Sequence, residues 1–155
     1  MAVVNKRAPT LPDLTAANPG NAPARLDHGT VRVARHQADI ANGDSATSTV
    51  EIARLPSRAV ILRQSALYSP GIGGLTDVDV GFSDDPDALV DGANLTSATS
   101  VSLMGAVAMG DCAQQVWQLA GYTKDPKKDI SVFVTLKTNA TAAGSLVPSI
   151  LYSVD

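Results

Sequence analysis

The sequence predicts an all-β fold, an antiparallel sandwich that follows an extended N-terminal arm. From Thr30 onward the chain consists of short runs rich in β-branched residues separated by turn signals, a pattern typical of sandwiches and barrels. Before that point the residues that break helices and strands fall close together, at Pro9, Pro12, Pro19, Gly20 and Pro23. A length of 155 residues fits one domain and a modest extension. We therefore expect an arm over residues 1–28 and a sandwich domain over residues 29–155.

The arm is expected to gain structure only against a neighbouring subunit. Fixing a backbone costs about 1–2 kcal/mol per residue, and this segment can bury little apolar surface by itself. It nevertheless contains scattered leucines and an excess of basic residues. The residues that we expect to contact a partner are Lys6, Arg7, Leu11, Leu14, Arg25 and Leu26, together with Arg35 just beyond the arm. An unstructured tail is the alternative interpretation.

Three strands are expected in the first half of the sandwich. Thr30–Gln37 alternates, with Val31 and Val33 on one face, and a turn follows at residues 42–44. Thr47–Leu55 also alternates and ends at a proline. Arg58–Tyr68 contains four consecutive apolar residues, which predicts a strand buried on both faces at the centre of the core.

The second half contains one clear strand and several weaker ones. Thr76–Phe82 alternates aspartates with valines, so one face is expected to be wet and the other packed. Residues 84–97 are interpreted as a loop with one helical turn. Weaker strands are expected at Ser100–Leu103 and Gln114–Leu119.

The chain is expected to end in a hairpin. Ile130–Lys137 and Leu146–Val154 are both rich in β-branched and apolar residues. The small residues of Thr138–Gly144 join them, and this spacing is typical of two neighbouring antiparallel strands.

Charge and hydropathy exclude several classes of partner. The net charge is −3, and a protein that binds nucleic acid needs a basic patch that this total does not supply. Residues 1–36 contain five basic and two acidic residues, whereas the rest contains seven basic and thirteen acidic ones. No run approaches the roughly 18 apolar residues that span a bilayer, so no membrane partner is expected.

The sequence offers few groups for catalysis, so we do not expect an enzyme and assign no catalytic residue. The two histidines, His28 and His36, lie in or near the arm, where nothing would orient them. No Gly-x-Ser-x-Gly elbow is present. Cys112 is expected to be a small buried hydrophobe, because its neighbours in sequence include an acid and no base. The glycines at 71, 73 and 74 predict a turn.

Six aspartates cluster between residues 77 and 91, at Asp77, Asp79, Asp84, Asp85, Asp87 and Asp91. A solvated acidic rim is the favoured interpretation, and a cation held at a subunit contact is the alternative. Their spacing matches no EF-hand loop, so no metal and no cofactor are assigned.

Sugar binding would call for exposed aromatic side chains. Tyr68, Trp117 and Tyr152 fall within expected strands, which favours core packing instead.

Four segments, taken in order, carry a resemblance to a known class of proteins. They are residues 48–61 (STVEIARLPSRAVI), 77–82 (DVDVGF), 90–95 (VDGANL) and 129–134 (DISVFV). In this order they resemble the capsid decoration, or cement, proteins of tailed bacteriophages, and the likeness covers roughly residues 29–155. The arm matches nothing obvious.

The resemblance implies a jelly-roll-like sandwich, often trimeric, made in the host cytoplasm and seated on the outside of the virion. Its partner would be the major capsid protein, whose subunits it would hold against internal pressure. Arg7, Arg25 and Arg35 would then anchor the arm to an acidic capsid surface. Two alternatives remain open, a surface or tail-associated adhesion module that binds host glycans and a neck or connector component.

Overall fold

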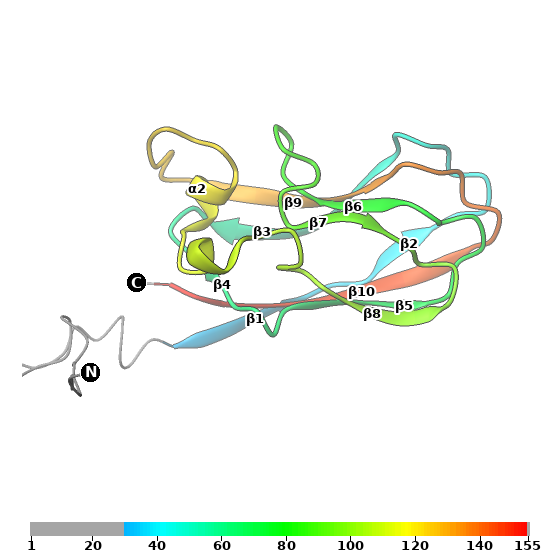
Figure 1. The fold of residues 1–155 in the computed structure, drawn as a ribbon, viewed down its shortest axis with the longest axis horizontal. Coiled ribbons are helices and arrows are strands. Elements are labelled where there is room, and N and C mark those ends of the chain that lie inside the picture. The colour runs from blue at the N-terminus through cyan, green and yellow to red at the C-terminus, as the bar shows by residue number, and fades with distance from the viewer. Residues whose placement is uncertain (1–29, 155) are drawn as a thin grey trace, which may run out of the picture.

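The computed structural model describes residues 30–154 and consists of two β-sheets packed face to face (Figure 1). The lower sheet in that view contains β1 (Val31–Arg35), β2 (Ala38–Ile40), β4 (Val60–Ile61), β5 (Ala66–Pro70), β8 (Ala98–Ser102) and β10 (Gly144–Ser153). The upper sheet contains β3 (Thr49–Pro56), β6 (Val78–Gly81), β7 (Val90–Ala93) and β9 (Asp129–Leu136). The expected all-β sandwich is confirmed.

The strand pairing is nested, which makes the sandwich a jelly roll. The first strand β1 pairs with the last strand β10, and β3 pairs with β9. Further inward along the chain, β5 pairs with β8 and β6 pairs with β7. The resulting orders are β1-β10-β5-β8 in one sheet and β3-β9-β6-β7 in the other, all antiparallel. Both β2 and β4 extend the first sheet by pairing with β10.

The core lies between the sheets and is built from small branched side chains, as the composition predicts. In β9 the inward positions Val132, Val134 and Leu136 are fully buried, and they alternate with partly or fully exposed residues. Leu67 of β5 and Ile150 of β10 close the core from the opposite sheet. One contiguous cluster of buried apolar residues joins the two layers.

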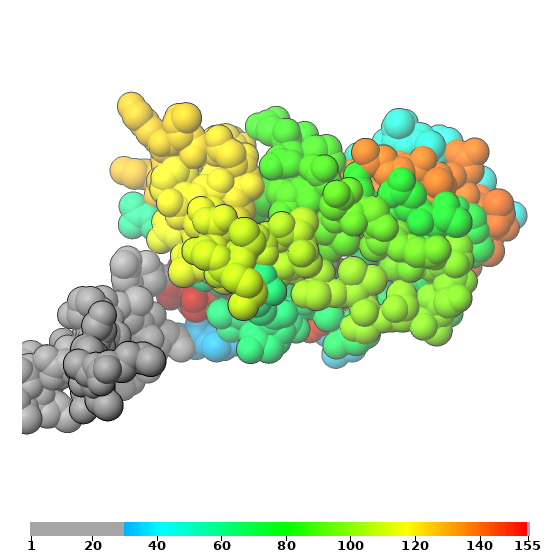
Figure 2. Space-filling model, in the orientation of Figure 1, coloured from blue at the N-terminus to red at the C-terminus, as the bar shows by residue number. Residues whose placement is uncertain are grey.

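The long connection between β8 and β9 packs at one end of the sandwich, where β1 begins and β10 ends (Figure 1). It contains a single 3₁₀ turn at Met109–Asp111 and one short helix, α2 (Val116–Leu119). In the space-filling view these residues form the yellow and yellow-green surface at that end (Figure 2). No helix within residues 30–154 is long and apolar enough to cross a membrane.

The expected terminal hairpin is wrong. Although β9 and β10 are consecutive, β9 lies in the four-stranded sheet and β10 in the six-stranded one. The residues between them cross from one layer to the other instead of turning within a sheet. The alternating patterns of both strands are correct, but the partner of each is a strand far away in sequence, β3 for β9 and β1 for β10.

Three further expectations need correction. The single strand expected at Arg58–Tyr68 is broken into β4 and β5, because the chain turns at residues 63 and 64. The strand expected at Gln114–Leu119 is the helix α2, with a capping box formed by Gln115 and Gln118. The residues interpreted as a loop, 84–97, include the strand β7.

Candidate interaction surface

The outward side of the lower sheet is nearly free of charge. In β1, β5, β8 and β10 the register sets one row of side chains away from the core, and we call this row the low-charge face. Among the described residues of these four strands, its single charged member is Arg35. At its margin, the Asp39 carboxylate of β2 accepts a hydrogen bond from the Ser145 hydroxyl at 2.6 Å. The low-charge face consists of Val31, Val33, Arg35, Ala66, Tyr68, Pro70, Ala98, Ser100, Ser102, Ser145, Val147, Ser149, Leu151 and Ser153.

Large apolar side chains are concentrated on this face. Val31, Val33 and Tyr68 are 53%, 56% and 47% exposed, and the only other large hydrophobic residue that is as open among residues 30–154 is Met109. Direct cross-strand neighbours extend the apolar surface, because Val33 is opposite Leu151 and Tyr68 is opposite Val147. Exposed apolar side chains on one sheet face make it a candidate interaction surface.

Arg35 is the one expected partner-binding residue that the structure places. It is exposed at the end of β1, opposite Ser149, on the low-charge face. The other six, Lys6, Arg7, Leu11, Leu14, Arg25 and Leu26, lie outside the described residues. The boundary between the arm and the domain likewise stays an expectation.

The sequence predicts that Tyr68 packs in the core, but its side chain points outward between Val147 and Ser100. The usable signal is the alternation of serine along β8 and β10, because Ser100, Ser102 and Ser149 all occupy outward positions. Their pattern identifies the wet side of the sheet to which Tyr68 belongs.

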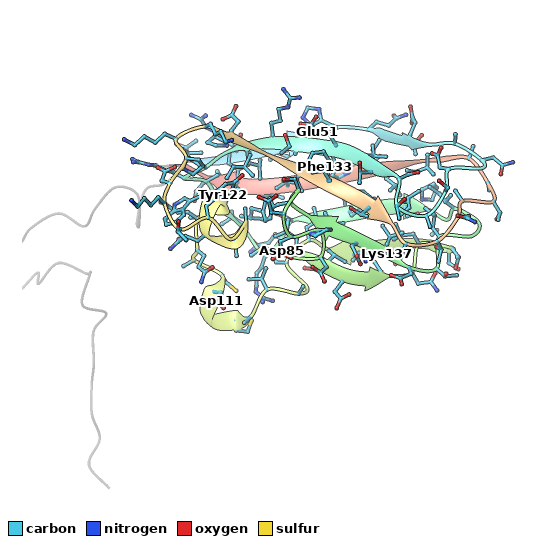
Figure 3. The ribbon with its side chains drawn as sticks, turned by 90° about the horizontal axis from the view of Figure 1, so that it is seen from above. Glu51, Asp85, Asp111, Tyr122, Phe133 and Lys137 are labelled. Atoms are coloured by element: carbon cyan, nitrogen blue, oxygen red, sulfur yellow. The ribbon has the colours of Figure 1, made fainter. Side chains whose placement is uncertain are left out.

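The outward side of the upper sheet is charged and cross-linked by polar contacts. Figure 3 looks down on it, with Glu51, Phe133 and Lys137 labelled. The Arg54 guanidinium donates to the Glu51 carboxylate at 2.5 Å, and the Ser131 hydroxyl donates to the same carboxylate at 2.7 Å. These two donors lower the pKa of Glu51 to about 2. The two outer faces of the sandwich therefore differ sharply in charge.

Asp79 corrects the expectation of a wet aspartate face on β6. It points away from the core, opposite Thr135, but it is 2% exposed. The Lys137 ammonium lies 3.0 Å from its carboxylate, and the Gly92 backbone N–H donates to it at 3.0 Å. The contact raises the pKa of Lys137. Asp79 is therefore a structural link between β6, β7 and the end of β9.

The remaining aspartates of the acidic segment form no site with the composition of a metal centre. Across residues 30–154 no group of three or more His, Cys, Asp or Glu side chains could hold a metal ion. A hydrogen bond with Asp87 raises the pKa of Asp85. Asp84, Asp87 and Asp91 are exposed, as expected for a solvated rim.

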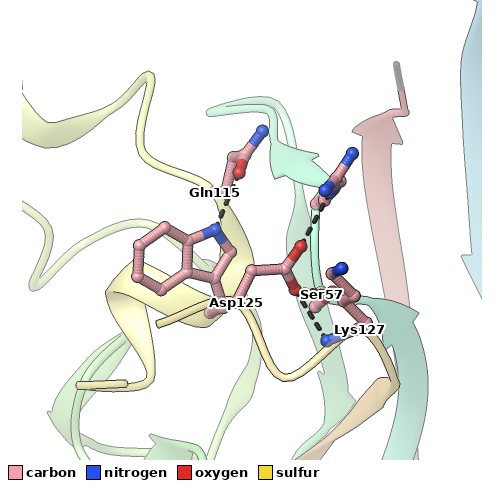
Figure 4. Close-up of polar contacts among 6 residues, drawn as sticks. Ser57, Gln115, Asp125 and Lys127 are labelled. Carbon is pink, nitrogen blue, oxygen red and sulfur yellow. Dashed lines mark hydrogen bonds and ion pairs between the residues drawn. The ribbon is translucent and has the colours of Figure 1, made fainter. Parts of the chain in front are cut away.

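A carboxylate network fastens the end of the sandwich next to α2 (Figure 4). Asp125 accepts hydrogen bonds from the Ser57 hydroxyl at 2.6 Å, the Arg58 guanidinium at 2.7 Å and the Lys127 backbone N–H at 2.8 Å. These three donors lower the pKa of Asp125 to about 2, the Ser57 bond having the largest effect. Nearby, the Trp117 indole N–H donates to Gln115 at 2.7 Å.

Cys112 has a cationic neighbour that its sequence context does not reveal. The Arg63 guanidinium donates to its sulfur at 2.8 Å, and the side chain is half-buried instead of fully buried. The two residues are 49 positions apart, so only the folded chain brings them together. His36 is exposed beyond the end of β1.

A small hollow of about 210 Å³ lies on the charged side, beside Tyr122 and Phe133. Phe82 also lines it, together with polar and charged residues that include Asp84 and Ser131. A lining that combines aromatic rings with carboxylate and hydroxyl groups suits a polyhydroxylated ligand.

No protein-family model and no curated protein sequence matches the chain. Among the solved structures that share its fold are chains from two phage capsids. A chain of the cyanophage Pam1 capsid asymmetric unit superposes with a TM-score of 0.53 at 15% identity, over 96% of this chain and 100% of that one. A chain of the capsid of Ralstonia phage GP4 superposes with a TM-score of 0.51 at 18% identity, over 80% of this chain and 85% of that one. The jelly roll described above is therefore a fold that this chain shares with chains from two phage capsids.

Proposed function

We propose that this protein is a structural virion protein of a tailed phage. It decorates the capsid, binds the outside of the shell of major capsid protein and stabilises that shell. It acts by forming contacts and performs no catalysis.

The observation that carries this proposal is the difference between the two outer faces of one sandwich. The charged face, with Glu51, Arg54 and Lys137, is well suited to water. The low-charge face exposes Val31, Val33 and Tyr68, and covering it with protein would remove this apolar surface from water. A sandwich whose low-charge face is covered by protein and whose charged face is exposed to water suits a protein bound to a shell. The shared fold with two phage capsid chains supports the same assignment.

The arm supplies the second set of contacts in this proposal. Lys6, Arg7 and Arg25 provide positive charge for an acidic capsid surface, and Leu11, Leu14 and Leu26 provide apolar surface. A protomer that lays its arm over a neighbour would bury about 1,000 Å² or more, as specific interfaces do. A trimer would repeat these contacts, and multivalency would convert modest contacts into strong attachment.

The test is cosedimentation with capsids stripped of decoration. The full chain should pellet with the capsids and should raise the temperature at which they break open. A variant that lacks residues 1–28 should pellet much less. If the full chain stays in the supernatant at saturating concentration, the proposed function is wrong.

The second candidate function is glycan binding by a surface or tail-associated adhesion module. The hollow beside Tyr122 and Phe133 favours it, because aromatic rings stack on sugar rings and the lining offers Asp84 and Ser131 for hydroxyl groups. A glycan array with the full chain separates the two functions. A signal that is lost in Tyr122→Ala, without capsid binding, would favour adhesion over decoration.

A further inference from the structure

We infer that residues 8–24 of one copy lie across the low-charge face of a second copy, with Asp13 of the arm paired to Arg35 of that face. This inference names the partner of the surface described above and rests on the proposed assembly role. It does not require that the low-charge face touch the capsid itself.

The chemistry of the low-charge face selects for an occupant with little charge. Outward positions on β1, β5, β8 and β10 are filled by apolar residues, alanines, a proline and serines, and Arg35 is the one cation among them. The adjoining carboxylate of Asp39 in β2 already accepts hydrogen bonds from Ser145 and Gln37. A strongly charged partner would lose its hydration at this face without finding ion pairs in return. A partner with one acidic group and several apolar groups would fit.

Residues 8–24 have that composition. Among these residues Asp13 is the only charged one, and Leu11 and Leu14 stand on either side of it. The basic residues of the arm lie outside the stretch, at Lys6, Arg7 and Arg25. One negative charge between two leucines therefore matches one positive charge, Arg35, on a strand that also presents Val33.

The four prolines of the stretch indicate that it lies on the face and does not extend the sheet. Pro9, Pro12, Pro19 and Pro23 lack backbone N–H groups and cannot complete a ladder of hydrogen bonds along an edge strand. A proline-rich chain instead favours an extended conformation with little conformational freedom to lose. Such a chain can pack its leucines against Tyr68 and Leu151 while its remaining polar groups face water.

The length of the arm and its point of attachment favour a second copy. The described chain enters β1 at Val31, which is opposite Ser153 at the end of β10. The 23 residues back to Ala8 could span about 75 Å if they were extended. The ten residues of β10 span only about 33 Å. The stretch can therefore reach well beyond its own domain.

Charge reversal tests the inference on the full chain. Asp13→Arg alone and Arg35→Asp alone should each weaken self-association, by roughly tenfold in dissociation constant, because each brings like charges together. The double variant should recover the association of the unmodified chain. Sedimentation velocity across a concentration series measures all four proteins.

Mixing the two single variants distinguishes exchange between copies from an arm folded onto its own body. Tagged Asp13→Arg chain should capture untagged Arg35→Asp chain better than either variant captures itself. Only a contact between copies can be rescued in this way. Failure of the mixture to associate, while the double variant is restored, would show an intrachain contact and overturn the inference.

A matched pair of aromatic substitutions controls for the choice of face. Tyr68→Ser changes an outward aromatic residue of the low-charge face, and Phe133→Ser changes an outward aromatic residue of the charged face. Only Tyr68→Ser should weaken self-association. Equal effects of the two, or a full chain that is monomeric at every concentration, would also overturn the inference. Capsid cosedimentation of the unmodified chain reports separately on the proposed function, so the two ideas can fail independently.

Discussion

The Lys137 ammonium lies 3.0 Å from the buried carboxylate of Asp79, and this pair joins three strands of one sheet. Asp79 belongs to β6, Lys137 follows β9, and the Gly92 N–H of β7 donates to the same carboxylate. The pair lies toward the edge of the upper sheet, where β7 has no further strand beside it. A buried charge here is satisfied by one cation and one backbone donor.

Replacement of Asp79 by alanine should destabilise the fold. The substitution leaves the Gly92 N–H without its acceptor and the Lys137 ammonium without its partner, and we expect a loss of about 1–3 kcal/mol in the free energy of unfolding. Urea denaturation measures it. Asp91→Ala, at an exposed position on β7, is the matched control and should change stability by less than about 0.5 kcal/mol. Equal losses would show that the Asp79 contacts contribute nothing.

Gly81→Ala should be severely destabilising. A Cβ at Gly81 would overlap the Asp85 carbonyl oxygen and lie 2.5 Å from the Pro86 carbonyl carbon, so the loop after β6 would have to move. That movement would break the hydrogen bond from the Phe82 N–H to the Asp85 carbonyl. We expect a loss of several kcal/mol, seen as a large fall in melting temperature.

Gly110→Ala provides the control for that substitution. A Cβ at Gly110 would meet no atom within 4 Å. The melting temperature of this variant should stay close to that of the unmodified chain. If both alanine variants melt alike, the close approach at Gly81 does not constrain the loop.

The stability of the fold should fall as the pH is lowered. The pKa of Asp125 is about 2 in the folded chain against an ordinary value of 3.8, and that of Glu51 is about 2 against 4.5. Because both pKa values are lowered by folding, these groups stabilise the fold fully above about pH 4.5 and lose their contribution as the pH falls toward 2. Thermal denaturation between pH 7 and pH 2 measures this decline.

Asp125→Asn isolates one contribution to the acid sensitivity. At pH 7 the variant should be less stable than the unmodified chain, because an amide accepts the Ser57 and Arg58 hydrogen bonds less strongly than a carboxylate. The difference should shrink as the pH approaches 2. A difference that is constant across this range would refute the assignment, and Asp91→Asn serves as the exposed control.

Adjacent residues of β5 should respond very differently to truncation. Leu67 is fully buried, so Leu67→Ala should cost about 2–5 kcal/mol in the free energy of unfolding. Tyr68 is its outward neighbour, and Tyr68→Ser should cost far less. Chemical denaturation of the two variants measures the contrast, which would be absent if the strand were buried on both faces as its sequence suggests.

The strand content of the fold could be predicted from the sequence because it depends on local alternation. Buried valines alternate with outward residues in β6 and β9, and both strands are present close to their expected bounds. The pairing could not be predicted in the same way. Closing a jelly roll joins residues more than a hundred positions apart, such as Val33 and Leu151, and no local pattern specifies such partners.

The sequence does not predict the environment of a side chain whose surroundings depend on a distant residue. The Asp79 carboxylate is buried by Lys137 and Gly92, neither of which is adjacent to it in sequence. The apolar run before Tyr68 predicts a core position for this residue. The chain turns before β5, however, and the tyrosine ring points outward. Local sequence patterns do not reveal the low-charge face because its members come from four strands of one sheet.

The pairing of β1 with β10 determines how the body would respond to tension. Five consecutive residue pairs, Val31–Arg35 with Ser149–Ser153, join the root of the arm to a strand in the interior of its sheet. The hydrogen bonds of an antiparallel pair run perpendicular to the strands. A pull on the N-terminal side along the axis of β1 would load those bonds together in shear instead of opening them one at a time. The first strand is thus a mechanically resistant attachment point for whatever grips the arm.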